Sequence, residues 1–207
     1  MNRYISEFIG TFFLVLAITM TGDPLVIGIT LSIMVYAGAN VSGSHFNPAV
    51  TFGLLLKKKI SVSDSVAYWV SQVLGALVAM AVFVILKDDT FIPKPAADAT
   101  AMQTYLVEII GTFALVYVIF QTAVCEKATP NSYFGLCIGM TIFCVASMGG
   151  AISGGAFNPA VYFGPAIYGL FTGGGLEISN LLLYLIGPMA GGALAAVVYC
   201  KLCPTCE

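Results

Sequence analysis

Long apolar stretches separated by short polar segments dominate this chain. Six of the stretches are long enough to cross a bilayer, and two are about half that length. A membrane-spanning helix needs about 20 apolar residues. The pattern therefore predicts an all-α membrane protein with helices at about 4–20, 24–40, 48–56, 65–86, 102–125, 133–150, 159–171 and 180–200.

Both short stretches follow a motif that the chain contains twice. Residues 42–50 read Ser-Gly-Ser-His-Phe-Asn-Pro-Ala-Val, and residues 153–161 read Ser-Gly-Gly-Ala-Phe-Asn-Pro-Ala-Val. Asn is a preferred N-cap because its side chain accepts a hydrogen bond from a free backbone N–H. Pro suits the first helical position, where its missing N–H is no loss. Each copy therefore predicts a loop that turns into a half-length helix.

The duplicated motif belongs to a longer internal repeat. Residues 7–12 (Glu-Phe-Ile-Gly-Thr-Phe) match residues 108–113 (Glu-Ile-Ile-Gly-Thr-Phe), and Gly75-Ala76 in the third long span matches Gly192-Ala193 in the sixth. We expect one channel-like domain over residues 1–207, with repeat 1 at about 1–86, a linker at about 87–101 and repeat 2 at about 102–203. Three full spans in each half would place the second half in the opposite orientation, as an inverted repeat.

Composition and charge agree with a membrane location. The chain is 59% hydrophobic and 9% charged, whereas soluble domains carry about 25% charged residues. If the N-terminus is cytoplasmic, the cytoplasmic segments carry Arg3, Lys57, Lys58, Lys59, Lys127 and Lys201. This agrees with the positive-inside rule and favours a multi-pass protein of the cell membrane with both termini in the cytoplasm. A net charge of -2 without a basic patch gives no reason to expect nucleic-acid binding.

The duplicated loops suggest a passage for neutral molecules. Half-helices that enter from opposite faces would meet near the midplane, with Asn47 and Asn158 at their tips. Helix N-termini carry about half a positive charge each, which disfavours cations and hydrated protons. Each Asn can cap its own helix through its oxygen and still point an N–H into the gap. The loops before them would offer a ladder of backbone carbonyls at Gly43, Ser44, His45, Gly154 and Ala156.

Three features resemble those of a known family: the glutamates that open each half, Phe163-Gly164-Pro165, and above all the paired motifs formed by Asn47, Pro48, Ala49, Asn158, Pro159 and Ala160. They resemble the major intrinsic protein family, the aquaporins and aquaglyceroporins, over essentially the whole chain. The resemblance implies a right-handed bundle of six transmembrane helices and two re-entrant half-helices, with one pore in each subunit of a homotetramer. It implies passive passage of water or small neutral solutes across the lipid bilayer.

The family also has an outer constriction of four positions, which here fall on Ile27, Ala146, Gly155 and Val161. Most members carry Arg directly after the second Asn-Pro-Ala, where this chain has Val161. Water-selective members usually have an aromatic residue and a His at the first two positions. The resemblance therefore implies a wider, less polar constriction without a fixed positive charge.

The solute itself is left open by the resemblance. Tyr162, Ala166 and Tyr184 resemble the water-conducting branch of the family, whereas Leu185 does not. We expect a channel for water and other small uncharged solutes such as glycerol, urea and ammonia, which excludes ions and protons. The alternative is a channel mainly for neutral solutes rather than water. A secondary carrier and a membrane structural protein with a closed pore are alternatives of a different class.

No metal triad or nucleophile–base pair occurs in the sequence, so we expect neither an enzyme nor a cofactor. For Glu7 and Glu108 we expect a supporting role, accepting hydrogen bonds from the adjacent loop, and the alternative is a proton relay. His45 is expected to order its loop in the neutral form, with a pH gate as the alternative. The tail thiols Cys200, Cys203 and Cys206 are expected to be reduced bystanders, with metal binding as the alternative.

Overall fold

The computed structural model describes residues 1–173 and 177–203. This part of the chain is helical, without strands, and six helices are long and apolar enough to cross a membrane. The helices are α1 Asn2–Thr21, α2 Pro24–Ser42, α3 Pro48–Leu56, α4 Val62–Lys87, α5 Ala101–Ile119 with the π-helical turn Phe120–Val124, α6 Phe134–Ser153, α7 Pro159–Phe171 and α8 Ile178–Leu202.

The predicted all-α membrane fold is confirmed, and the two short helices have the predicted bounds of 48–56 and 159–171. Local sequence signals explain where other helices begin and end. Asp23 accepts hydrogen bonds from the first turn of α2, and Thr100 and Gln103 form a capping box at the start of α5. At the other ends of α2 and α6, Gly43 and Gly154 adopt φ angles of 82° and 83°. Glycine adopts this left-handed conformation without a steric penalty.

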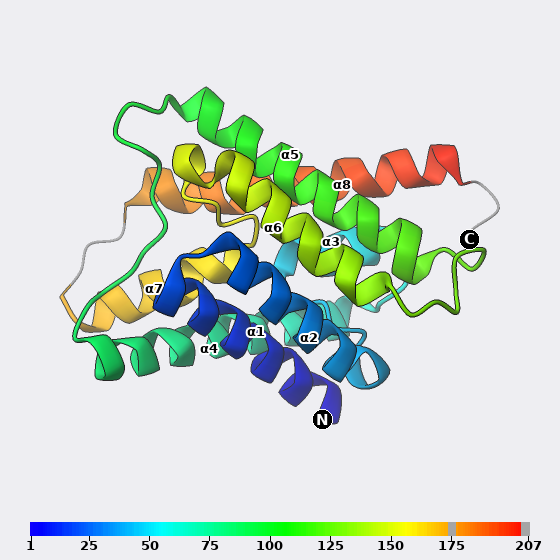
Figure 1. Cartoon of the computed structure of the whole chain (residues 1–207), viewed down its shortest axis with the longest axis horizontal. Coiled ribbons are helices and arrows are strands. Elements are labelled where there is room, and N and C mark those ends of the chain that lie inside the picture. The colour runs from blue at the N-terminus through cyan, green and yellow to red at the C-terminus, as the bar shows by residue number, and fades with distance from the viewer. Residues whose placement is uncertain (174–176, 204–207) are drawn as a thin grey trace.

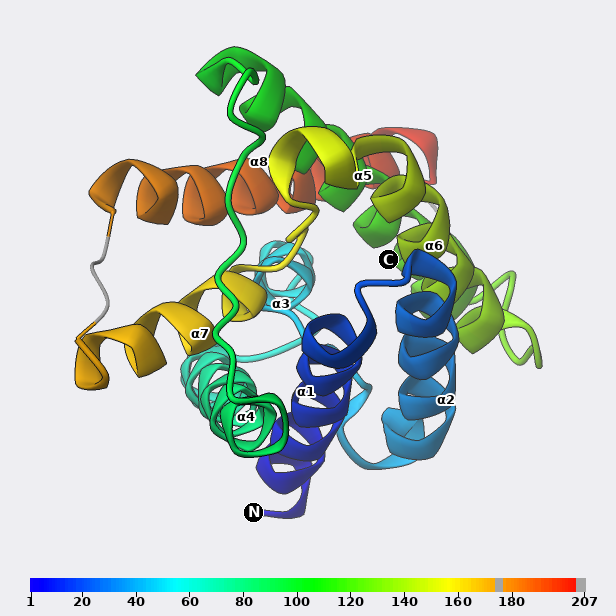
Figure 2. The same cartoon turned by 60° about the vertical axis from the view of Figure 1, so that its left-hand side comes forward.

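The two halves of the chain are interleaved in the bundle. Helix α1 packs on α4 and α5 packs on α8, while α2 and α6 join the two halves. The short helices cross over, because α3 packs on α8 of the second half and α7 packs on α4 of the first. Figure 1 shows the α4–α5 linker at one end of the bundle and the end of α8 at the other. In Figure 2, α3 lies in the interior, and the linker passes in front of α8 and α7 on its way from α4 to α5.

Close helix contacts correct the predicted register of the repeat. A Cβ atom on Gly75 would lie 2.4 Å from the carbonyl oxygen of Phe8, the residue after Glu7. A Cβ atom on Gly191 would lie 2.5 Å from the carbonyl oxygen of Ile109, the residue after Glu108. Gly75 therefore corresponds to Gly191, and the predicted pairing with residue 192 was wrong by one position. Two adjacent glycines in the sixth span made both registers look alike in the sequence.

Helices α2 and α6 approach each other through glycine as well. A Cβ atom on Gly139 would lie 2.1 Å from the carbonyl oxygen of Gly28 and 2.1 Å from Oγ of Ser32. In lipid, such small-residue contacts allow the close packing that holds helices together.

We therefore expect Gly139→Ala to destabilise the fold by about 1–3 kcal/mol through overpacking. Gly150→Ala, in the same helix, is the matched control because a Cβ atom there would meet nothing within 4 Å. That change should stabilise the helix by about 0.5–1 kcal/mol, the usual gain of Ala over Gly in a helix. Thermal unfolding of both variants in detergent measures the difference, and equal melting temperatures would contradict this account of the α2–α6 contact.

Candidate functional site

The two short helices are tied together at their N-terminal tips by two asparagines. The side-chain oxygens of Asn47 and Asn158 each accept a hydrogen bond from the backbone N–H two residues on, at 2.8 and 2.9 Å. The side-chain nitrogen of Asn47 donates to the carbonyl oxygen of Phe157, and that of Asn158 donates to the carbonyl oxygen of Phe46, both at 2.9 Å. An amide nitrogen has two N–H donors, so each asparagine keeps one for a ligand.

Two cavities meet beside this junction. The larger, of about 390 Å³, is lined by both asparagines and also by all four predicted constriction positions, Ile27, Ala146, Gly155 and Val161. The smaller, of about 290 Å³, is lined by residues 43–45 of the first loop. Ser44, His45 and Val50 line both cavities, so the cavities adjoin at the first loop.

The loops before the short helices have the same unusual backbone conformation. Residues Ser44, Phe46, Gly155 and Phe157 adopt positive φ angles of 55°, 51°, 65° and 47°. Within the described part of the chain, no group donates a hydrogen bond to the carbonyl oxygens of residues 43–45 or 154–156. All six residues line one of the two cavities, so their carbonyls are available to a molecule there.

Glu7 holds the first loop in this conformation. Its Oε1 accepts hydrogen bonds from the backbone N–H of His45 at 2.9 Å and from Oγ of Ser42 at 2.7 Å, and its Oε2 accepts from the N–H of Phe46 at 2.7 Å. The carboxyl group is fully buried. A buried carboxylate is tolerated when hydrogen bonds replace its hydration. Here two donors are N–H groups of the loop, one is the hydroxyl at the end of α2, and one is Nε2 of Gln72 in α4, which donates to Oε2 at 2.8 Å.

Glu108 repeats these contacts in the second half. Its Oε1 accepts from the N–H of Ala156 at 3.1 Å and from Oγ of Ser153 at 2.7 Å, and its Oε2 accepts from the N–H of Phe157 at 2.6 Å. Both glutamates thus bind two consecutive backbone N–H groups and one serine. The backbone strain of a non-glycine residue at positive φ costs about 1–3 kcal/mol, and these hydrogen bonds oppose it.

Sequence reasoning missed the role of the glycine three residues after each glutamate. A Cβ atom on Gly10 would lie 2.1 Å from the ring of Phe46, and one on Gly111 would lie 2.4 Å from the ring of Phe157. The Glu-x-x-Gly pattern therefore provides both the acceptor for the loop and the space for its phenylalanine. The sequence did carry a signal for this role, because the Glu-x-x-Gly spacing occurs in both repeats.

A tyrosine in each half was also missed as a loop anchor. The hydroxyl of Tyr68 donates to the carbonyl oxygen of Ser42 at 2.7 Å, and the hydroxyl of Tyr184 donates to that of Ser153. These bonds hold the ends of α2 and α6, from which the loops depart. The two tyrosines have the same separation in sequence as Gly75 and Gly191, 116 residues, so the corrected register would have indicated them.

His45 is held from two sides at the smaller cavity. Its Nδ1 lies 3.0 Å from Oγ1 of Thr51, and its ring meets that of Tyr68 edge-on, with 4.9 Å between the centroids. Both contacts fix the ring within the first loop.

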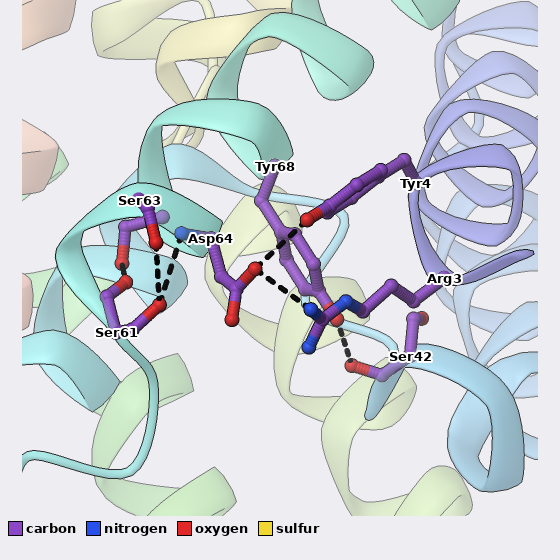
Figure 3. Close-up of polar contacts among 8 residues, drawn as sticks. Arg3, Tyr4, Ser42, Ser61, Ser63, Asp64 and Tyr68 are labelled. Carbon is purple, nitrogen blue, oxygen red and sulfur yellow. Dashed lines mark hydrogen bonds and ion pairs between the residues drawn. The ribbon is translucent and has the colours of Figure 1, made fainter. Parts of the chain in front are cut away.

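Figure 3 shows that Tyr68 stands next to a polar cluster that joins α1 to α4. The hydroxyl of Tyr4 and the guanidinium of Arg3 both contact Oδ1 of Asp64 at 2.8 Å. In the same view, Tyr68 reaches down to Ser42. The start of α1 and the first turn of α4 are thereby linked near the first loop.

Of the tail cysteines, Cys200 and Cys203 line neither of the two cavities. The Sγ atom of Cys200 lies 3.0 Å from Nζ of Lys57, and Cys203 contacts Gln121 at 3.7 Å. Cys206 lies outside the described residues. Across residues 1–173 and 177–203, no group of three or more His, Cys, Asp or Glu side chains is placed to hold a metal ion.

Known proteins resemble this chain in sequence and in fold. The sequence model of the major intrinsic protein family matches residues 1–199. "Probable aquaporin TIP2-2" of Oryza sativa subsp. japonica is 35% identical over 96% of this chain and 86% of its own length. "Aquaporin AqpM" of Methanothermobacter thermautotrophicus is 35% identical over 96% of both chains. "Glycerol uptake facilitator protein-like 6" of Lactiplantibacillus plantarum is 34% identical over 95% of both.

The fold is also that of a solved relative. The X-ray structure of the aquaglyceroporin from Plasmodium falciparum superposes with a TM-score of 0.87, at 24% identity, over 99% of this chain and 98% of that one. With the family match and the six membrane-length helices, this makes the protein an integral multi-pass membrane protein. The chain belongs to the major intrinsic protein family, and it is a passive channel for water and small uncharged solutes rather than an enzyme.

Proposed function

We propose that the permeant molecule passes through the two adjoining cavities and between Asn47 and Asn158. The observation that carries this proposal is the pair of asparagines that cap opposite helices, bind each other's loops and keep one N–H free. A water or hydroxyl oxygen can accept from these donors while its hydrogens bind the unpaired loop carbonyls. Since both helices present their positive ends, cations and hydrated protons are repelled at the same point.

The constriction residues support a broad range of neutral solutes. Ile27, Ala146, Gly155 and Val161 offer no charged group, and no Lys, Arg, Asp or Glu lines the larger cavity among the described residues. Ion exclusion therefore rests on the half-helix dipoles and on desolvation. Room at Ala146 and Gly155 favours passage of glycerol, urea and ammonia in addition to water.

The chain's symmetry supports an inverted repeat of residues 1–86 and 102–203 around the linker. The crossed packing of α3 on α8 and of α7 on α4 agrees with such a repeat. We place the protein in the cell membrane, and the basic residues favour cytoplasmic termini. In this orientation the smaller cavity faces the cytoplasm and the larger cavity faces outward. Membership of the family favours a homotetramer with one pore per subunit.

The direct test is the swelling or shrinking rate of proteoliposomes in gradients of water, glycerol, urea and ammonia. We expect water permeability well above that of bare lipid, together with measurable flux of the other solutes. Flux of glycerol without excess water flux would instead support the alternative, a channel mainly for neutral solutes. Permeability equal to bare lipid for all four would contradict the proposal.

Val161→Arg should narrow the larger cavity and add a fixed positive charge. We expect glycerol permeability to fall about tenfold, which corresponds to about 1.4 kcal/mol of added barrier, and water permeability to fall less. Stopped-flow light scattering measures both fluxes. Val62→Arg is the matched control, since Val62 is 67% exposed at the start of α4 and away from both cavities. Unchanged fluxes in folded Val161→Arg would show that this residue does not line the pore.

Glu7→Gln and Glu108→Gln test the proposed support of the loops. A glutamine amide has one acceptor oxygen, so at least one buried backbone N–H of the loop loses its partner, at a cost of about 1–3 kcal/mol. We expect lower melting temperatures and reduced water flux per folded molecule for both variants. Glu126→Gln, at an exposed site in the α5–α6 connection, should change neither. Wild-type flux and stability in both Glu7→Gln and Glu108→Gln would contradict a supporting role for the two glutamates.

A further inference from the structure

We propose that Lys57 and Cys200 form a redox-dependent covalent bridge, in which one oxygen atom joins Nζ of the lysine to Sγ of the cysteine. The oxidant is hydrogen peroxide, and a thiol reductant reverses the reaction. The bridge connects the end of the first half-helix to the last helix of the bundle, and it does not depend on the path proposed for the permeant molecule. For Cys200 it replaces the bystander role that the sequence favours.

The two reacting atoms already lie in contact. Nζ of Lys57 is 3.0 Å from Sγ of Cys200, although 143 residues separate the two along the chain. Lys57 is the C-cap of α3, and Cys200 lies in the last turn of α8. Helix α3 packs on α8, so the contact joins two elements that the fold already holds together.

An aromatic ring positions the lysine side chain. Nζ of Lys57 lies 5.5 Å from the centroid of the Tyr199 ring, which is within the range of a cation–π contact. That ring is fully buried and stacks on the ring of Phe120, with 4.9 Å between the centroids. Because the ring is fixed and Lys57 is half-buried, the amine is held beside the sulfur. Reacting groups that are already positioned pay little entropy to come together.

The sulfur of Cys200 is open to a small oxidant. Reactive cysteines lie in electropositive and accessible surroundings. Cys200 is exposed, and the ammonium group of Lys57 is its neighbour. Cys203, in contrast, is half-buried at the end of α8 and contacts Gln121 of the π-helical turn at 3.7 Å. Of these two thiols, Cys200 is therefore the one placed to react with both a peroxide and an amine.

The reaction balances with two peroxide molecules. The first transfers one oxygen to Sγ of Cys200: the O–O bond breaks, the sulfur is oxidised to a sulfenic acid, and the other oxygen leaves as water. Lys57 releases one proton to the solvent and becomes a neutral amine. The second peroxide takes one hydrogen from the sulfenic acid and one from this amine, the N–O bond forms, and the peroxide is reduced to two water molecules. Reduction by a dithiol returns the thiol, the amine and one water.

The bridge acts on the half-helix that carries Asn47 at its tip. Lys57 directly follows α3, which begins one residue after Asn47. Neither Lys57 nor Cys200 lines either cavity. The bridge therefore fixes the C-terminal end of α3 to α8 without entering the cavities, and it makes this half-helix harder to displace when peroxide is present.

The test is peptide mass spectrometry of the full-length protein, purified in detergent and treated with hydrogen peroxide. We expect a peptide pair that joins Lys57 to Cys200, with a mass one oxygen higher and two hydrogens lower than the sum of the free peptides. Dithiothreitol should remove it. We also expect the melting temperature to rise by about 2–4 °C over that of the reduced protein.

Lys57→Arg and Cys200→Ser should abolish both the crosslink and the shift in melting temperature, because arginine lacks the primary amine and serine lacks the sulfur. Lys58→Arg, at the next and exposed residue, is the matched control for the lysine. Cys144→Ser, at another exposed thiol, is the matched control for the cysteine. Both controls should keep the crosslink and the shift.

Three results would overturn the proposal. One is a disulfide between Cys200 and Cys203 or Cys206 in place of the bridge to Lys57. Another is a sulfenic acid at Cys200 that dimedone traps without any crosslink. The third is a crosslink that persists in Lys57→Arg. The mass measurement on the wild-type protein decides the matter even where a variant folds poorly.

Discussion

Two hydrogen bonds between the halves, from the amide of Asn47 to the carbonyl of Phe157 and from Asn158 to Phe46, hold the centre of the structure. All four groups are almost completely buried, so separating the half-helices would leave several polar atoms unpaired, at about 1–3 kcal/mol each. The same amide oxygens cap the helices. The tips of α3 and α7 therefore position each other, and the rest of the fold brings the loops to this meeting point.

The repeated glutamates and glycines hold the two loops in position beside the half-helix tips. Each glutamate binds two consecutive N–H groups of its loop. Among the described residues, no group donates to the carbonyls of residues 43–45 and 154–156. The following glycine leaves space for the loop's phenylalanine. A segment at membrane depth with unpaired carbonyls is tolerated only where it lines a wet path. The glutamate contacts that hold each loop therefore also leave its carbonyls available to a molecule in the pore. Because the helix termini oppose positive charge, the proposed path does not need a charged residue at the constriction.

Local signals made much of this predictable from the sequence. Asn-Pro marks a helix start within two residues, so the first residues of α3 and α7 were predicted correctly, and the length of each apolar run indicated where the helix ends. The four constriction positions could be placed on one cavity because the resemblance fixed their spacing. Contacts between distant segments were not readable in this way. The packing of Gly10 on Phe46 depends on the folded loop, and the Gly191-Gly192 pair hid the register of the repeat.

The central claim is that a chain of small molecules runs between the two asparagine amides. A cryo-electron microscopy map of the protein in lipid nanodiscs, at a resolution that shows ordered water, tests it most directly. The account predicts water density continuous from one cavity to the other, about 3 Å from the side-chain nitrogens of Asn47 and Asn158 and from the loop carbonyls. Asparagines that lie apart, or a dry junction that separates the two cavities, would contradict it.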